Sequence, residues 1–207
     1  MPKPAYHHGD LPQQIHQRAL ATLREQGEAA ITLRTLASQL GVSATALYRH
    51  VTDRQSLLAE LAIHGFRMLR ERLLAVPTGN DRHALIGIGR VYVRFARDEP
   101  NLYRLMFSGH LFEKGSHPRL DAAGLGAFGV LENTVARAQQ NGYLKPAPLA
   151  VYTAAAWSLV HGLSQLIIDG HLDDPDEQLA TALSAILIDG THTRPDTGRP
   201  HPTGETP

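Results

Sequence analysis

Residues 31–51 read Ile-Thr-Leu-Arg-Thr-Leu-Ala-Ser-Gln-Leu-Gly-Val-Ser-Ala-Thr-Ala-Leu-Tyr-Arg-His-Val, and this stretch decides the fold. Thr32 and Ser43 each precede a segment with helical apolar spacing, at the position where a side-chain oxygen caps a helix. Gly41 lies between the segments, where a left-handed residue ends a helix without steric cost. The pattern predicts a helix-turn-helix, the unit that places its second helix in the major groove of DNA.

The residues around this unit strengthen the interpretation, since two short helices joined by glycine also occur in proteins that bind no DNA. In the second helix Leu47 and Val51 are expected to point inward. The outward positions are then Ala44, Thr45, Tyr48, Arg49 and His50. Upstream, Ile15, Ala19 and Leu23 mark a first helix that ends near Gly27. After the second helix of the motif, Thr52 or Asp53 is expected to cap the next one, with Arg54 in its first turn. The free N–H groups of such a helix start suit a DNA phosphate.

At this point the chain resembles the TetR family of bacterial repressors, over roughly residues 6–60. The matching residues are Ile31–Arg34, Ala37, Leu40–Ser43, Leu47–Val51, Asp53, Arg54, Leu57 and Leu58. Two further segments are similar to one subclass of the family, the opening residues 6–11 and the Trp-Ser-Leu-Val-His-Gly of residues 157–162.

The resemblance implies roles for these residues. Tyr48 and His50 would touch the sugar-phosphate backbone, and Arg34 and Arg54 would lie near phosphates or groove edges. Thr45, Ala46 and Arg49 would read bases. The residues predicted to contact DNA are Thr32, Arg34, Ser43, Ala44, Thr45, Ala46, Tyr48, Arg49, His50 and Arg54. Because residues 44 and 46 are both alanine, fewer side chains can form hydrogen bonds with base edges. Sequence specificity is therefore expected to depend more on Arg49, which can pair with a guanine edge.

Composition agrees with a specific DNA reader better than with a nonspecific nucleic-acid coat. The 207-residue chain has a formal net charge of zero. Up to His50 it carries five basic residues (Lys3, Arg18, Arg24, Arg34, Arg49) and three acidic ones (Asp10, Glu25, Glu28). This mild excess suits a dimer that makes a few phosphate contacts per subunit and takes its specificity from base edges.

Several other site types are not expected. The chain has no cysteine, which excludes disulfides and thiolate metal sites. The histidine pairs His7–His8 and His110 with His117 lack metal-ligand spacing, so we expect no metal and no cofactor. Its opening residues do not follow the order of a signal peptide. The apolar stretch 149–168 contains Ser158, His161, Ser164 and Gln165, and is expected to be a buried helix of a dimer or bundle core. We therefore expect a cytoplasmic protein with no membrane partner.

The remaining pattern is helical throughout, which predicts an all-α protein of about nine helices. The expected domains are a three-helix DNA-binding domain (1–56), a helical regulatory and dimerisation domain (57–190) and a disordered tail (191–207). After the first domain, helices are expected near 53–76, 102–107, 146–169 and 174–189. Two more are marked by apolar residues, one at Ile88–Phe95 that stops at Pro100 and one at Phe128–Ala138 that ends at Asn141. The helix from 53 to 76 would join the two domains.

The last two helices predict a homodimer. Small or polar residues recur along one face of the first of them, and apolar residues along one face of the second; the family resemblance implies a four-helix interface between subunits. The alternative is packing within one subunit. The predicted interface residues are Ala155, Ser158, Gly162, Gln165, Leu179, Leu183, Ile186 and Leu187. Two recognition helices about 34 Å apart would read a palindrome in successive major grooves.

A ligand pocket between these helices is a second hypothesis, and a plain apolar core is its alternative. The candidate lining residues are Tyr92, Phe95, Tyr103, Met106, Phe128, Trp157 and His161. The sequence places three glycines, at 124, 126 and 129, within one helix, which lowers the stability of that helix. Such a cost indicates that another group approaches this helix closely, which favours a cavity. Trp157 and His161 share a helix face and are candidate polar anchors for a hydrophobic or aromatic molecule.

These features predict a transcriptional repressor that binds a palindromic operator on double-stranded DNA and is released by a small hydrophobic ligand. Two alternatives remain. One is an activator or a constitutive DNA-organising protein without an effector. The other is an enzyme of the helical domain with His161 or Asp169 as an acid/base group; no nucleophile paired with a base, phosphate loop or metal cluster supports it.

Overall fold

The computed structural model describes residues 11–113 and 115–191, and every regular element in them is helical. The elements are α1 (Leu11–Gln26), a 3-10 turn (Glu28–Ala30), α2 (Leu33–Leu40), α3 (Ala44–Tyr48), α4 (Arg54–Leu74), α5 (Asp81–Asp98), α6 (Pro100–Met106), α7 (Pro118–Gln140), α8 (Leu149–Ile168) and α9 (Gln178–Thr191). The all-α prediction of about nine helices is thus confirmed for this part of the chain. His7, His8 and residues 192–207 of the expected tail lie outside it, and the first tail residue, Thr191, belongs to α9.

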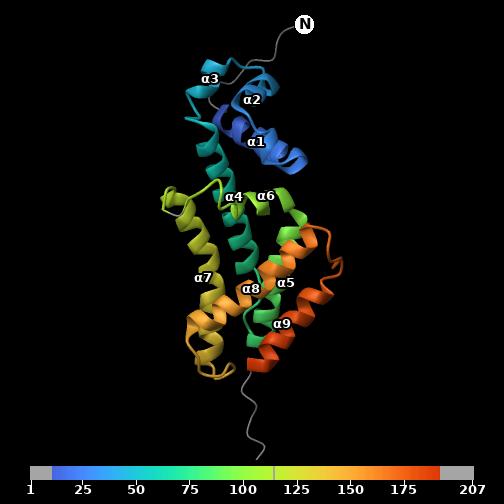
Figure 1. The fold of residues 1–207 in the computed structure, drawn as a ribbon. Helices are drawn as coiled ribbons and strands as arrows, with labels where there is room; N and C mark the ends of the chain where they lie inside the picture. The colour runs from blue at the N-terminus through green and yellow to red at the C-terminus, as the bar shows by residue number, and fades with distance from the viewer. Residues whose placement is uncertain (1–10, 114, 192–207) are drawn as a thin grey trace, which may run out of the picture.

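Helices α1, α2 and α3 form a small unit at one end of the molecule, which we call the reading head (Figure 1). Its predicted caps are confirmed. The Thr32 side chain accepts a hydrogen bond from the backbone N–H three residues later at 3.0 Å, and Ser43 does the same at 3.1 Å. Gly41 ends α2 with a φ of 68°, in the left-handed region. Asp53, rather than Thr52, caps α4 through a 2.7 Å bond.

Helix α4 runs from the reading head into the second part of the fold, where it packs against α5, α6 and α7, while α8 and α9 pack against α5 (Figure 1). It carries buried residues along almost its whole length, from Leu57 to Leu73. One buried apolar cluster continues from Leu11 of α1 to Val130 of α7. Gly65 allows α6 to approach, since a Cβ there would lie 2.5 Å from the Met106 sulfur. The head is therefore packed directly on the second domain.

Polar contacts reinforce this junction. The Arg24 guanidinium of α1 donates two hydrogen bonds, of 2.8 and 2.6 Å, to the Glu99 carboxylate at the start of α6. Asn101 donates to the Arg24 carbonyl at 3.0 Å. Near the first turn of α4, the Gln55 amide donates to the Leu111 carbonyl at 2.8 Å. The start of α6 is thus connected to the head by hydrogen bonds as well as by apolar packing.

The predicted start of the last helix is wrong by four residues. We expected this helix from residue 174, but α9 begins at Gln178. The Asp174 carboxylate accepts hydrogen bonds from the backbone N–H groups of Leu179 and Ala180, each at 2.9 Å, and so caps a helix that lies further along. Glu177 has a φ of 60°, which prevents the helix from extending backwards. Its carboxylate is held by arginine side chains of α5.

Helix α8 contains no Asp, Glu, Lys or Arg and is long and apolar enough to span a membrane by length and composition. One such helix is weak evidence for a membrane protein, because core helices of soluble proteins can be equally long and apolar. Only 17% of its most apolar window is buried within this chain. The expectation that α8 is buried is therefore not met by the single chain.

Candidate functional site

The outer face of the reading head presents the side chains predicted to contact DNA. Tyr48 of α3 is 56% exposed, although it is a large aromatic residue. Leu47 is fully buried, as predicted, and Val51 is half-buried. The exposed members of the predicted set are Thr32, Arg34, Ser43, Ala44, Thr45, Tyr48, Arg49 and His50, and Ala46 is half-buried. A row of exposed polar and aromatic side chains on a rigid, capped helix is suited to reading base edges.

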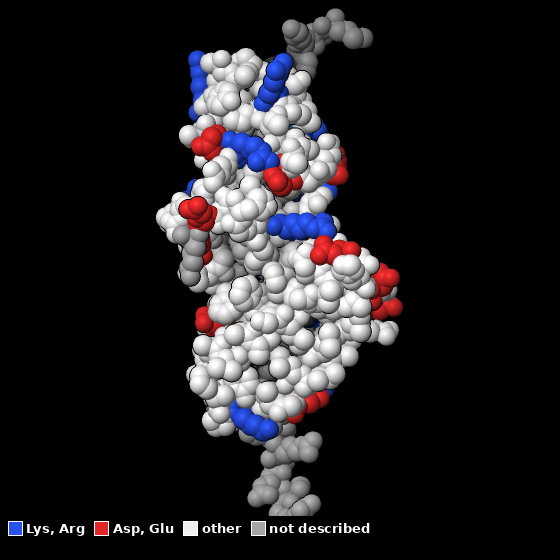
Figure 2. Space-filling view, in the orientation of Figure 1, with Lys and Arg blue, Asp and Glu red and all other residues white. Residues whose placement is uncertain are grey.

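The charge of this surface also favours DNA. No Asp or Glu occurs between Glu28 and Asp53, whereas Arg34 and Arg49 lie in this stretch. Neither arginine forms an ion pair with the described residues. Figure 2 shows Lys and Arg side chains at the head end of the molecule. The head therefore offers uncompensated positive charge to a phosphate backbone.

Arg54 is placed differently from the other predicted contacts. Its Nε donates to the Ile31 carbonyl at 2.7 Å, and its Nη2 donates to the Glu28 carbonyl at 2.6 Å and to the Glu28 carboxylate. These bonds join the first turn of α4 to the segment before α2. Arg54 thus braces the head internally, and its guanidinium has few donors left for a phosphate.

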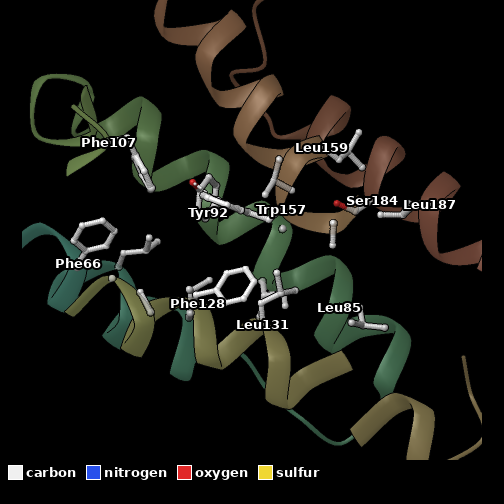
Figure 3. A pocket seen from close by; sticks show the side chains of 18 of the residues that line it. Phe66, Leu85, Tyr92, Phe107, Phe128, Leu131, Trp157, Leu159, Ser184 and Leu187 are labelled. Atoms are coloured by element: carbon white, nitrogen blue, oxygen red, sulfur yellow. Dashed lines mark hydrogen bonds between the residues drawn. The ribbon is translucent and has the colours of Figure 1, made fainter. Parts of the chain in front are cut away.

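The second domain contains a cavity of about 470 Å³, enclosed mainly by α4, α5, α7, α8 and α9 (Figure 3). No lining residue carries a charge. The lining residues are Phe66, Leu69, Leu73, Leu85, Ile88, Gly89, Tyr92, Phe107, Gly124, Leu125, Ala127, Phe128, Leu131, Ala156, Trp157, Leu159, Val160, Ser184, Leu187 and Ile188. An apolar cavity of this size with few polar groups is typical of small-molecule sites.

Three of the seven residues predicted to line a pocket do so, namely Tyr92, Phe128 and Trp157. The other four do not, since Phe95, Tyr103 and Met106 are buried elsewhere in the apolar core and His161 is absent from the cavity wall. Gly124 lines the cavity, but a Cβ there would make only an ordinary contact with the Phe66 ring, at 3.7 Å, so no close approach requires this glycine. Gly126 and Gly129 are not part of the lining.

A hydrogen-bond network closes one side of the cavity. The Trp157 Nε1 donates to the Tyr92 hydroxyl at 3.2 Å. The His161 Nδ1 lies 2.9 Å from the Tyr92 hydroxyl and 2.7 Å from that of Tyr103, and the two hydroxyls are 3.1 Å apart. Burial lowers the pKa of His161, so its imidazole is neutral at pH 7. Burial raises the pKa of Tyr92 to about 12 and that of Tyr103 as well, so both phenols keep their protons.

The proton count of this network is balanced. With the His161 proton on Nε2, Tyr103 can donate to Nδ1 and Tyr92 can donate to Tyr103. Trp157 then donates to Tyr92. Each of these three donors has an acceptor inside the protein, so the Trp157 Nε1 and the His161 Nδ1 need no ligand to complete their bonding. The His161 Nε2–H donates to none of the described residues, but His161 is not part of the cavity wall.

The predicted dimer residues divide into two groups. Those of α8, namely Ala155, Ser158, Gly162 and Gln165, are all exposed, and a Cβ at Gly162 would meet no atom within 4 Å. On α9, Leu179 and Ile186 are exposed, Ile186 to 69%. Leu183 and Leu187 are half-buried; Leu183 packs inside the chain and Leu187 lines the cavity. Figure 2 shows the face over α8 and α9 to be largely free of charged side chains.

Sequence reasoning missed most of the cavity wall. Phe66, Leu69 and Leu73 of α4 line it at the spacing i, i+3 and i+7, and this periodicity could have marked them as one face. Ser184 of α9 also lines it, and nothing in its sequence neighbourhood distinguishes it. Among the described residues no group of three or more His, Asp or Glu could hold a metal ion.

Comparison with known proteins identifies both halves of the chain. Residues 15–61 match the model of the bacterial regulatory proteins of the tetR family. Residues 85–189 match the tetracyclin repressor-like C-terminal domain.

Individual relatives agree with these matches. The chain is 28% identical over 164 residues to the uncharacterised HTH-type transcriptional regulator Rv0681 of Mycobacterium tuberculosis, covering 78% of this chain and 72% of that protein. A protein of unknown function from Rhodococcus sp. RHA1 has a similar structure, with 30% identity, a TM-score of 0.83, and coverage of 92% and 100%. A tetR-family regulatory protein from Rhodococcus RHA1 has the same fold, with 18% identity, a TM-score of 0.70, and coverage of 87% and 96%.

Proposed function

The chain belongs to the TetR family of DNA-binding transcriptional regulators, and we propose that it is a cytoplasmic repressor released from its operator by a small hydrophobic ligand. The observation that carries this proposal is the uncharged cavity of about 470 Å³. Its wall includes Phe66, Leu69 and Leu73 of α4, the helix that also supports the reading head. A ligand in the cavity therefore touches the element that positions the DNA-reading side chains.

The proposed DNA contacts are those of the exposed head surface. Arg49 reads a base edge, while Tyr48 and His50 contact the backbone around it. Arg34 contributes a phosphate contact. Arg54 is a weaker candidate for such a contact than the sequence suggested, because its donors already serve Glu28 and Ile31.

The proposed switch is a shift between two arrangements of the heads. Ligand contact with the α4 residues of the cavity tilts this helix, and α6 follows through its close packing at Gly65. The Arg24–Glu99 pair transmits the motion to α1. Repression is relieved only if the ligand binds the DNA-incompetent arrangement more tightly, since equal affinity shifts nothing.

The active species is proposed to be a homodimer joined through α8 and α9. Helix α8 has no Asp, Glu, Lys or Arg, and only 17% of its most apolar stretch is buried within its own chain. Its apolar face is therefore available for another molecule to cover. Leu166 of α8 and Ile186 of α9 are 44% and 69% exposed. A second copy that covers this face with the same face would produce a two-fold dimer, which suits a palindromic operator.

The function is tested with operator DNA selected from a random duplex library by the purified protein. The first expected result is an enriched inverted repeat with half-sites about one helical turn apart. The second is a gel shift that weakens in the presence of an apolar ligand, with reciprocal weakening of ligand binding by DNA. If a ligand binds and the two coupling factors both equal one, the switch is contradicted. A constitutive binder would show the same shift with every ligand.

The dimer is tested with Gly162→Leu, since a leucine there would hold two facing helices apart. We expect monomers in light scattering and loss of operator binding. The control is Gly129→Leu, on α7, where a Cβ also meets no atom within 4 Å but which lies outside the proposed interface. A Gly162→Leu variant that remains a dimer would place the interface elsewhere.

A further inference from the structure

Ser184 stands out among the buried serines and threonines of the described helices. Four others satisfy their hydroxyls inside the protein: Thr134, Thr153 and Ser164 donate to a carbonyl four residues earlier, and Thr22 bonds Gln39. Ser184 is only 5% exposed and makes no hydrogen bond with any described residue. A hydroxyl that faces an apolar cavity and has no protein partner depends on water or a ligand for its hydrogen bond, and without one it costs free energy that an alanine at the same place would not.

Close helix packing does not explain the serine. Ser184 lies where α9 crosses α5, and a Cβ on Gly89 would come within 2.6 Å of its hydroxyl oxygen. Alanine would allow the same approach of the two helices, because the hydroxyl is the atom nearest to α5. Ser184 lines the cavity, and Figure 3 shows its oxygen directed toward the side of the pocket where Trp157 lies. The partner of this hydroxyl is therefore to be sought in the cavity.

The rest of the wall offers no competing anchor. The lining side chains include no charged group, and the other polar ones, Tyr92 and Trp157, are engaged in the network that ends at His161. A carboxylate or an ammonium group placed here would lose its hydration without gaining an opposite charge. A hydroxyl or carbonyl group would meet one unpaired hydroxyl.

We propose that Ser184 is the hydrogen-bonding anchor of the cavity, and that the ligand is an uncharged, mainly apolar molecule with one hydroxyl or carbonyl group. This inference rests on the proposed function, since it names the chemistry of the same ligand. It replaces Trp157 and His161 as the expected polar anchors. Ser184 accordingly determines specificity between an apolar molecule and its singly hydroxylated analogue.

The experiment compares three probes that share one chain: 1-decanol, decanoate, and decane supplied from a cyclodextrin complex. The readout is the fluorescence of Trp157, the single tryptophan of the chain, which lies in the cavity wall. Each probe is titrated into the full-length protein, into Ser184→Ala and into Ser164→Ala. The last variant is the matched control, because it also removes a buried serine hydroxyl but one that bonds its own helix at 2.7 Å outside the cavity.

For the wild type we expect 1-decanol to bind more tightly than decanoate. In Ser184→Ala the affinity for 1-decanol should fall about 3- to 10-fold, the worth of one neutral hydrogen bond. The affinity for decane should stay the same or rise, and Ser164→Ala should behave as wild type toward all three probes.

The outcomes separate this inference from the function on which it rests. If Ser184→Ala keeps the wild-type ratio of 1-decanol to decane affinity, the anchor is wrong while probe binding and the proposed switch stand. Equal binding of decanoate and 1-decanol overturns the uncharged class. If none of the probes binds the wild type, the apolar effector site itself is contradicted, and the inference falls with it.

Discussion

The reading head and the cavity domain are built from the same kind of helix but use their side chains in opposite ways. The head packs its buried side chains into the apolar cluster that it shares with the second domain and directs its functional side chains, such as Tyr48 and Arg49, into solvent. The cavity domain keeps about 470 Å³ of its interior unfilled and directs its functional side chains, such as Trp157 and Ser184, into that space. DNA requires a rigid exterior, whereas a small ligand requires an interior that is not fully packed.

This difference indicates how well each region should tolerate the loss of a side-chain contact. The head holds α2 and α3, which have 8 and 5 residues, in place through their caps and a few buried side chains, so the loss of any one of these contacts is expected to change its geometry. The cavity domain already contains unfilled volume, and its long helices can adjust around it. The comparison leads to three predictions, which run from the largest expected effect to the smallest.

The first prediction compares two leucine truncations on the same helix. Leu61 of α4 is fully buried in packed core, while Leu73 of α4 borders the cavity. We expect Leu61→Ala to lower the free energy of unfolding by about 3–4 kcal/mol and Leu73→Ala by about 2 kcal/mol, because the second change only enlarges an existing space. Urea unfolding at one fixed protein concentration measures both. Equal losses would mean that the cavity is closed in solution.

The second prediction concerns the exterior of the head. Arg49→Ala should weaken binding to the selected operator by about 1–3 kcal/mol and relax base preference at one position of each half-site. Arg18→Ala is the matched control, an exposed arginine of α1 outside the predicted contact set. Tyr48→Phe should weaken all sequences about equally, since it removes a backbone contact. Repeating the library selection with each variant gives the result, and an unchanged base preference for Arg49→Ala would refute its role.

The two regions also differ in how far sequence predicts them. The head could be read almost residue by residue, because caps, the left-handed Gly41 and the inward Leu47 all follow from local spacing. The same applied to the presence and type of the later helices. The cavity depends on which helices cross, and no local signal reveals that. Ser184 and Gly89 are 95 residues apart in the sequence, and only the crossing of α5 and α9 makes their contact visible.

Arg54 and Asp174 show the same limit on a smaller scale. Their chemistry suggested a phosphate contact and a helix start, respectively. Each is instead engaged by backbone groups, Arg54 by carbonyls up to 26 residues away and Asp174 by N–H groups five and six residues later. A polar side chain near a helix end has several possible partners, and tertiary packing decides which one it meets.

The last prediction concerns the junction between the two regions, where His16 of α1 meets His64 of α4 with ring centroids 5.2 Å apart. The pKa of His16 lies below its usual 6.5, first because burial disfavours the imidazolium and second because His64 is close, although Glu60 opposes this. The pKa of His64 is also lowered, by burial and then by Arg24. In the cavity domain, burial lowers the pKa of His161 in the same direction.

The sign of the effect follows from linkage. Between the lowered folded-state pKa and the unfolded value near 6.5, the unfolded chain binds more protons than the folded one, so stability rises with pH. The full contribution is present above pH 6.5 and is lost as the pH falls below it. We therefore expect the free energy of unfolding to decrease between pH 7.5 and 5.5, by less than either preceding change. His16→Gln should flatten this dependence, whereas His83→Gln, at an exposed position of α5, should keep the wild-type curve. Denaturant unfolding across this range measures it, and a His16→Gln curve parallel to wild type would show that the junction does not disfavour the charged imidazole.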